Sequence, residues 1–323
     1  MITQAIILAA GKGQRLNGHE VPKPLAMVGG RMLLRRALDS LAMNGVRDVG
    51  IVVGYRGEEI KAAFSEGHPE VRITWIDNPE YEKPNGVSLL AARWFLKGRA
   101  FLLMSDHVFC PDVLQPLTRL DAKGDATILV VDSDIDRCYD LDDATKVLRS
   151  GDLIADIGKE IPDYDAIDTG IFVISPLLVS ELAKLESPSL SDGVRRLARR
   201  GLVRTHDIGG RLWQDVDTPE TKKHTEWLLR AYGQELRGRT PLDGDAAVCF
   251  RVPSLEVAAT VVTKLRQRGH DASVHGQGDA ARWVRVTTAG GVVDATVLQA
   301  ALTAATEGML GLTPLRAGVG RAT

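Results

Sequence analysis

The first residues whose types are suited to binding or catalysis lie in a glycine-rich turn that follows an apolar run. Residues 5–10 are apolar without alternation, a pattern typical of a strand buried on both faces of a parallel α/β sheet. From Gly11 to Arg15 the side chains are absent, basic or polar. Backbone N–H groups and cations in such a turn can bind an anion beyond the carboxyl end of the strand, where open α/β sheets bind ligands. The turn therefore predicts an anion-binding loop.

Two familiar glycine motifs do not fit this turn. A dinucleotide fingerprint needs glycine at position 16, which is Leu16, and a P-loop needs Ser or Thr after the lysine, where Gly13 stands. What remains, L-A-A-G-x-G-x-R-L followed by P-K-P-L at 22–25, resembles the signature of nucleotidyltransferases that join an NTP to a phosphorylated sugar or alcohol and release pyrophosphate. The alternative is a tight turn with solvated cations, and the joint presence of Arg15 and Lys23 favours the resemblance.

A carboxylate follows a later buried strand. Asp106 comes just after the apolar residues 100–104, and a carboxylate there costs free energy unless it is paired or binds a metal. Metal-assisted nucleotidyl transfer needs oxygen ligands for Mg²⁺, so we predict Asp106 as a metal ligand. The structural alternative is a cap for a helix that starts near Pro111. His107 either orients Asp106 or is a packed loop side chain.

A second pair of acids lies at 215 and 217, in a W-x-D-x-D-T-P segment. In the nucleotidyltransferases that this chain resembles, such a segment supplies the second Mg²⁺ carboxylate. Two acids two residues apart share one side of an extended segment. Because a helix N-cap is expected near Thr218-Pro219, one acid is a candidate for a structural role. We favour Asp217 as the ligand, with Asp215 as the second choice.

Further motifs resemble those of one particular family among these nucleotidyltransferases. N-G-x-S-L at 85–89, M-S-D-H-V at 104–108, and the segments 144–161 and 164–172 together resemble inositol-1-phosphate cytidylyltransferases over about residues 1–230. Members of that family make CDP-inositol from CTP and inositol 1-phosphate. The resemblance implies nucleotide binding by Leu8, Ala10, Gly11, Lys12, Gly13, Asn85, Gly86 and Ser88. The alternative for 85–88 is a helix-entry turn.

The same resemblance implies an acceptor site. A lysine in the position of Lys159 contacts the acceptor phosphate, and Asp168, Thr169 and Gly170 line the acceptor pocket. A phosphate dianion needs a cation beside it, and a polyol needs polar groups that recognise its hydroxyls. The catalytic cations are then Arg15, Lys23 and Lys159. The alternative for Lys159 is an exposed hairpin lysine, and the acidic residues between 132 and 143 would as an isolated run form a solvated face.

These residues need a sheet to position them. Helical spacing over 32–42 and 58–64, with strands at 49–54 and 71–76, gives a β-α-β-α-β order that predicts a parallel, doubly wound arrangement with right-handed crossovers. Later segments predict strands at 100–104, 126–131 and 203–208, and helices at 87–96, 177–184, 191–200 and 220–232. We expect a Rossmann-like, doubly wound, mixed α/β sheet forming a nucleotidyltransferase domain over residues 1–236.

The remaining residues predict a separate module. Gly238, Pro241 and Gly244 among polar residues indicate a linker at 237–245. Residues 246–323 then predict a small ferredoxin-like α/β accessory domain of β-α-β-β-α order with a loose C-terminal tail. Its strands are expected at 246–252, 272–275 and 283–287, and its helices at 254–268 and 297–305. We expect a regulatory, docking or dimerising role for it, with a homodimer as one form.

Length and composition limit the functional classes. The 323 residues favour two domains, and a net charge of −2 argues against bulk nucleic-acid binding. Three scattered cysteines, Cys110, Cys138 and Cys249, predict neither a disulfide framework nor a zinc site. No run approaches the roughly 18 to 20 apolar residues of a membrane helix, and the apolar start lacks the basic region of a signal peptide. We therefore expect a cytoplasmic protein.

Three functions remain open. The first is a Mg²⁺-dependent cytidylyltransferase for inositol 1-phosphate or a related cyclitol phosphate. The second is a transferase with another NTP or another acceptor, such as a sugar 1-phosphate, phosphocholine or a phosphonate. The third is a catalytically silent protein that binds nucleotide-linked ligands and regulates a partner. The five charged residues Arg15, Lys23, Asp106, Lys159 and Asp217 favour an enzyme, because a sensor has no need of metal carboxylates.

Overall fold

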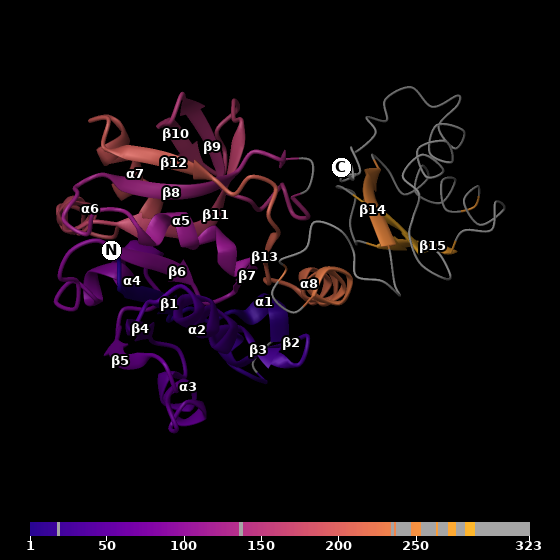
Figure 1. The fold of residues 1–323 in the computed structure, drawn as a ribbon, viewed down its shortest axis with the longest axis horizontal. Helices are drawn as coiled ribbons and strands as arrows, with labels where there is room; N and C mark the ends of the chain where they lie inside the picture. The colour runs from indigo at the N-terminus through magenta and orange to yellow at the C-terminus, as the bar shows by residue number, and fades with distance from the viewer. Residues whose placement is uncertain are drawn as a thin grey trace. The chain divides into compact units, whose positions relative to one another are not determined.

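A computed structural model describes residues 1–17, 20–135, 138–233, 236, 247–252, 263, 271–275 and 282–287. Contacts between residues divide the chain into two compact units, Met1–Thr225 and Glu226–Thr323. Figure 1 shows the helices and strands of both. Helix α8, Pro219–Tyr232, continues across the division.

The sheet of the first unit begins with parallel strands joined by helices. β1 lies between β4 and β6, and β4 pairs with β5, all in parallel. Parallel neighbours need crossover connections, which α2, α3 and α4 provide. The elements up to residue 118 are β1 Gln4–Ala9, α1 Gln14–Asn17, η1 Lys23–Leu25, β2 Met27–Val28, β3 Arg31–Met32, α2 Leu33–Met43, β4 Asp48–Val53, α3 Gly57–Ala63, β5 Arg72–Asp77, α4 Asn85–Ala91, β6 Ala100–Met104, β7 His107–Phe109, η2 Pro111–Val113 and α5 Gln115–Thr118.

Beyond residue 118 the sheet becomes mixed. β11 runs antiparallel to both β6 and β8, whereas β12 is parallel to β8. The nine strands follow the order β5-β4-β1-β6-β11-β8-β12-β10-β9, so the mixed α/β sheet expected from the sequence is confirmed. The further elements are β8 Thr127–Asp132, β9 Lys146–Ser150, β10 Leu153–Gly158, β11 Ala166–Ile174, α6 Pro176–Leu182, α7 Leu190–Ala198, β12 Val203–Asp207, β13 Trp213–Asp215 and α8.

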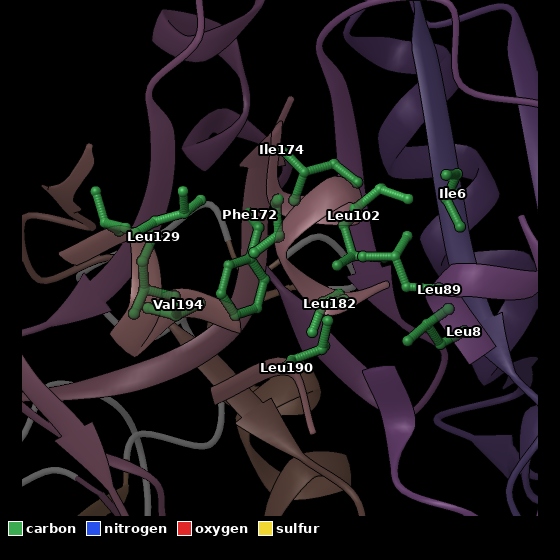
Figure 2. Close-up of a cluster of buried hydrophobic side chains, with 14 of the residues drawn as sticks. Ile6, Leu8, Leu89, Leu102, Leu129, Phe172, Ile174, Leu182, Leu190 and Val194 are labelled. Atoms are coloured by element: carbon green, nitrogen blue, oxygen red, sulfur yellow. The ribbon is translucent and has the colours of Figure 1, made fainter. Parts of the chain in front are cut away.

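Both faces of this sheet are buried. Figure 2 shows the cluster on one face, where residues of β1, β6, β8 and β11 pack with residues of α4, α6 and α7. Its labelled members are Ile6, Leu8, Leu89, Leu102, Leu129, Phe172, Ile174, Leu182, Leu190 and Val194. Ile7, Ile51 and Leu103 are fully buried as well, and they lie on the other face because strand residues alternate. This burial explains the apolar run at 5–10.

A two-stranded ribbon outside the main sheet brings the acidic segments together. β7 pairs with β13 in antiparallel register, with His107 opposite Asp215. The Val216 N–H donates to the Asp106 carbonyl over 3.0 Å. The sequence suggested an extended segment before α8 but gave no pairing partner for it. The ribbon places Asp106 and Asp217 beside each other.

The structure departs from the sequence-based expectation most clearly at α4 and near residue 111. The helix expected at 87–96 is α4, which begins at Asn85, directly after Pro84, and ends at Ala91. Proline fixes the backbone before the first turn, so the helix starts two residues earlier than the apolar spacing indicates. Near residue 111 the chain forms the short η2, whose N-cap Cys110 makes no side-chain cap bond. Asp106 therefore does not cap a helix there.

The second unit contains an antiparallel sheet. β14 Ala247–Val252, β15 Asp271–His275 and β16 Arg282–Thr287 have the order β14-β16-β15, in agreement with the three expected strands. The expected linker at 237–245, the helices at 254–268 and 297–305, and the C-terminal tail lie outside the described residues, apart from residue 263. The ferredoxin-like fold and the boundary at 236 stay predictions. Within the described part of the chain, no helix combines the length and apolar character needed to cross a membrane.

Candidate active site

A cavity of about 550 Å³ opens at the carboxyl ends of β1 and β6. Its walls come from the 11–15 loop, η1, the segment 81–88, the end of β6 and the start of α8. It is lined by Leu8, Ala9, Ala10, Gly11, Lys12, Gly13, Gln14, Arg15, Lys23, Pro24, Tyr81, Lys83, Asn85, Ser88, Met104, Ser105, Asp106, His107 and Asp217. Most of the predicted nucleotide-binding and metal-binding residues therefore surround one space; Gly86, Lys159, Asp168, Thr169, Gly170 and Asp215 are not part of this lining.

The two glycines of the loop have different structural reasons. Gly13 has a φ of +56°, and a Cβ there would lie 2.4 Å from Cβ of Lys23. Glycine is thus required both by the left-handed backbone and by the close approach of Lys23. A Cβ on Gly11 would meet nothing within 4 Å. Among the described residues, the N–H groups of Gly11, Lys12 and Gly13 have no acceptor, as an anion-binding turn requires.

Lys23 is the buried cation of the site. It is 7% exposed, its Nζ lies 2.5 Å from Oδ2 of Asp106, and it also donates to Oδ1 of Asp217. Burial opposes the charge on Lys23, but the two carboxylates outweigh it and raise the pKa of the ammonium. Burial alone would likewise raise the pKa of Asp106, yet Lys23 and His107 lower it to about 2. One ammonium therefore contacts both carboxylates.

A residue without a predicted role extends these ion pairs. Arg15 donates to Oδ2 of Asp217 and to Oδ2 of Asp143, both over 2.8 Å, and Lys159 donates to Oδ1 of Asp143. The alternating chain Asp106, Lys23, Asp217, Arg15, Asp143 and Lys159 thus joins all three predicted catalytic cations. Asp143 belongs to the acidic run, and no local pattern in that run distinguishes it from its neighbours.

The two acids near residue 216 occupy different environments. Asp217 contacts Lys23 and Arg15 at the cavity wall, whereas Asp215 accepts a hydrogen bond from Gln214 Nε2 over 2.8 Å. Burial raises the pKa of Asp215 to about 6. The N-cap hydrogen bond of α8 comes from Thr218, whose Oγ1 accepts from the Thr221 N–H over 3.2 Å. Neither acid is needed as a cap, and the geometry favours Asp217 over Asp215 as the metal ligand.

The residues present fit a divalent cation that is shared with a substrate. Oδ1 of Asp106 is buried and has no hydrogen-bond partner among the described residues, so it can still bind a cation. Within that part of the chain no three His, Cys, Asp or Glu side chains gather to hold a metal by themselves. Mg²⁺ is commonly bound by one or two carboxylates together with substrate phosphates. Asp106 and Asp217 match that number.

The segment 85–88 is only partly a binding surface. Asn85 and Ser88 line the cavity, but Oδ1 of Asn85 accepts from the Leu190 N–H over 2.9 Å and Oγ of Ser88 accepts from Asn78 Nδ2 over 3.0 Å. Gly86 lies outside the lining, and its part in nucleotide binding stays a prediction. A Cβ on Gly86 would lie 2.5 Å from the carbonyl oxygen of Pro188, so close packing of two backbones requires this glycine.

None of the predicted acceptor residues 168–170 lines the cavity, and their part in acceptor binding stays a prediction. Thr169 is fully buried, and its hydroxyl donates to the Val130 carbonyl over 2.8 Å. Asp168 Oδ1 accepts from the Gly170 N–H over 2.7 Å, and burial raises the pKa of Asp168 to about 6. Their polar groups are engaged within the protein.

This fold and this site define a class. A mixed α/β sheet with a glycine loop, two carboxylates and one buried ammonium near its strand ends is the arrangement of a nucleotidyltransferase. Residues 5–207 match the family described as the MobA-like NTP transferase domain, and the chain belongs to that family. Nucleotidyltransferases of this family generally use a divalent metal.

Individual relatives add detail. The chain is 37% identical over 231 residues to the bifunctional IPC transferase and DIPP synthase of Rubrobacter xylanophilus, covering 70% of this chain and 51% of the relative. It is 30% identical over 273 residues to the CMP-5'-(3-aminopropyl)phosphonate synthase of Streptomyces rubellomurinus, covering 75% and 41%. The solved inositol-1-phosphate CTP transferase from T. maritima superposes with a TM-score of 0.63 at 27% identity, over 75% of this chain and 98% of that structure. The chain spans about half the length of the curated relatives it matches.

Proposed function

We propose that the chain is a Mg²⁺-dependent cytidylyltransferase that joins CTP to inositol 1-phosphate and releases pyrophosphate, giving CDP-inositol. The observation that carries the proposal is the chain of ion pairs from Asp106 to Lys159. It joins three cations and two prospective metal ligands, and all of these except Lys159 line one cavity. The choice of CTP and inositol 1-phosphate follows the T. maritima structure that this fold resembles.

The reaction is a single in-line displacement. A phosphate oxygen of inositol 1-phosphate attacks the α-phosphorus of CTP, and the bond from that phosphorus to the oxygen bridging to the β-phosphate breaks. The leaving pyrophosphate takes that oxygen and the electron pair. The phosphate dianion is already a nucleophile, so neither a covalent intermediate nor a general base is required.

Catalysis is then positioning and neutralisation of charge. The N–H groups of the 11–15 loop bind the β- and γ-phosphates, and Lys23 and Arg15 balance charge at the α-phosphate. Lys159 binds the acceptor phosphate. Asp106 and Asp217 hold Mg²⁺, which when bound withdraws charge from the reacting phosphates. For Lys23 to serve this purpose, its ammonium must shift from the two carboxylates toward phosphate oxygens.

A second acceptor class has its own support. The relative from Streptomyces rubellomurinus is named for a CMP-linked aminopropylphosphonate, and a phosphonate offers the same attacking oxygens as a phosphate. Because Asp168, Thr169 and Gly170 do not line the cavity, they give no preference for a polyol. A catalytically silent regulatory protein is the third candidate, and the paired carboxylates Asp106 and Asp217 count against it.

Pyrophosphate release tests these candidates. The full chain with Mg²⁺ is assayed with CTP, UTP, GTP, ATP and dTTP against inositol 1-phosphate, glucose 1-phosphate, phosphocholine and 2-aminoethylphosphonate. We expect turnover with CTP and inositol 1-phosphate alone. Turnover with another pair would replace the substrates and keep the reaction, and bound nucleotide without any turnover would overturn the enzyme assignment. The cytoplasmic location and the homodimer stay predictions.

A further inference from the structure

The ring of His107 is held by residues from distant parts of the chain. Its Nδ1 lies 2.7 Å from the carbonyl oxygen of Thr169, so Nδ1–H donates to that oxygen. The ring stacks on Trp213, with centroids 5.9 Å apart and planes 19° from parallel. Trp213 is held in turn, because its Nε1–H donates to Oδ2 of Asp132 over 2.9 Å. The hydrogen bond and the stacking contact together fix the orientation of the His107 ring.

Gly170 makes the room for this ring. It has a φ of +70°, and a Cβ there would lie 2.4 Å from Cε1 and 2.6 Å from Nδ1 of His107. The carboxylate of Asp168 holds the turn by accepting the Gly170 N–H. The register between β11 and β8 shifts between Asp168 and Phe172, so the regular strand is interrupted where Thr169 turns its carbonyl to the imidazole. The D-T-G segment therefore has a structural reason that involves no acceptor.

The other nitrogen of the ring faces the site. Nε2 of His107 lies 3.5 Å from Oδ1 of Asp106, the buried oxygen that has no hydrogen-bond partner among the described residues. Oδ2 of the same carboxylate contacts Lys23. The imidazole thus lies beside Oδ1 and the ammonium contacts Oδ2, so groups from two different segments flank the carboxylate of Asp106.

We propose that His107 is a positioning residue, which fixes the carboxylate of Asp106 toward Lys23 and Asp217, and that Asp168, Thr169 and Gly170 support this ring. The inference rests on the proposed function for the part that Asp106 plays in the reaction. It assigns no chemistry to the imidazole itself.

A double-mutant cycle of Gly170→Ala and His107→Ala tests the contact. With the ring in place, the methyl group of Gly170→Ala displaces it, and we expect kcat to fall at least tenfold while both KM values change less than threefold. In the His107→Ala background, where the ring is absent, Gly170→Ala should lower kcat by less than a further factor of three. If Gly170→Ala instead raises the acceptor KM equally in both backgrounds, residues 168–170 bind the acceptor and the proposal is wrong.

Two further measurements separate positioning from packing. The urea midpoints of the wild type, the two single variants and the double variant measure the contact independently of activity. A matched control is His68→Ala, which removes another buried imidazole, 3.0 Å from Asp39, and should leave kcat unchanged. If the effects of the two substitutions on the urea midpoint are not additive but kcat is unaltered in every variant, the ring only packs. A crystal structure of His107→Ala should show the Asp106 carboxylate rotated away from Lys23; an unmoved carboxylate would overturn the proposal even if no substrate pair is turned over.

Discussion

Lys23 and Asp217 lie 194 residues apart in the sequence, yet a hydrogen bond from Nζ to Oδ1 joins them at the cavity wall. The ammonium is almost fully buried between Asp217 and Asp106. Removal of Lys23 would leave the two carboxylates facing each other with little solvent around them. This costs far more free energy than the loss of an exposed ion pair.

Lys23→Ala should therefore affect both stability and rate. We expect about 3 to 5 kcal/mol of destabilisation from the unpaired carboxylates and a loss of rate on the order of a hundredfold or more, since one electrostatic stabiliser is worth about 3 to 4 kcal/mol. Urea unfolding and pyrophosphate release measure the two effects. Lys61→Ala is the control, because Lys61 also pairs with two carboxylates, but those of Glu58 and Asp77 are exposed. A near-normal rate for Lys23→Ala would contradict its assignment.

The loop glycines allow a matched comparison. Gly13→Ala forces a left-handed alanine against Lys23 and should lower stability by at least about 1 to 2 kcal/mol, with a loss of activity. Gly11→Ala meets no neighbour within 4 Å and should fold normally but raise the KM for CTP. Thermal unfolding and nucleotide kinetics distinguish the two; equal melting temperatures would argue against the close contact between Gly13 and Lys23.

Metal dependence should separate the two acids of the 215–217 segment. Asp217→Asn removes a ligand at the cavity wall, so the Mg²⁺ concentration for half-maximal rate should rise about tenfold or more, as it does when a ligand worth more than 1.4 kcal/mol is lost. Asp215→Asn leaves that wall intact and should change the Mg²⁺ concentration for half-maximal rate less than threefold. Rates measured against Mg²⁺ at fixed CTP decide this, and a larger shift for Asp215→Asn would exchange the two roles.

Asp143 should act on substrate affinity more than on stability. Its two oxygens hold Arg15 and Lys159, and asparagine has only one acceptor oxygen for them. Both partners are more than half exposed in their side chains, so we expect Asp143→Asn to cost less than about 1 kcal/mol in unfolding free energy. The acceptor KM should rise about fivefold, because Lys159 is no longer oriented. An acceptor KM that falls would show that Asp143 competes with the acceptor phosphate.

Asp168 predicts a pH dependence of stability. Burial raises its pKa from 3.8 to about 6 in the folded chain, so the folded state binds this proton more tightly than the unfolded state. Its contribution is complete below about pH 4 and is lost as the pH rises through about 6. Asp168→Asn should remove this loss, which is at most about 3 kcal/mol for a two-unit shift.

Urea unfolding of the wild type and Asp168→Asn at pH 4.5 and 7.5 measures that difference. The exposed Asp152→Asn, whose side chain is 62% exposed beside Arg204, serves as the control and should follow the wild type. A difference between wild type and Asp168→Asn that does not change with pH would contradict a buried, titrating carboxyl.

Much of the fold could be predicted because local patterns encode it. The apolar runs at 5–10 and 100–104 and the helical spacing over 32–42 coincide to within one residue with the observed β1, β6 and α2. Strand burial on two faces leaves a run without alternation, and a helix with one buried face leaves a 3.6-residue period. Boundaries were less accurate, as α4 shows, because a proline and a contact to Leu190 decide where it begins.

For the site, the sequence alone determined which charged groups follow the ends of strands. Asp106 could be named because it follows a buried strand whose carboxyl end meets that of the first strand at one edge of the sheet. Arg15, Lys23 and Asp217 could be named because they stand in motifs that resemble those of a known family. Only the tertiary structure decided what they contact: Asp143 reaches Arg15 across 128 residues of sequence, Gly86 packs on Pro188, and Gly170 makes room for His107. The contact between Gly170 and His107, for example, depends on the position of β7 and on the register of β11. Such contacts are set by packing across the sheet, which leaves no periodic signal in any one segment.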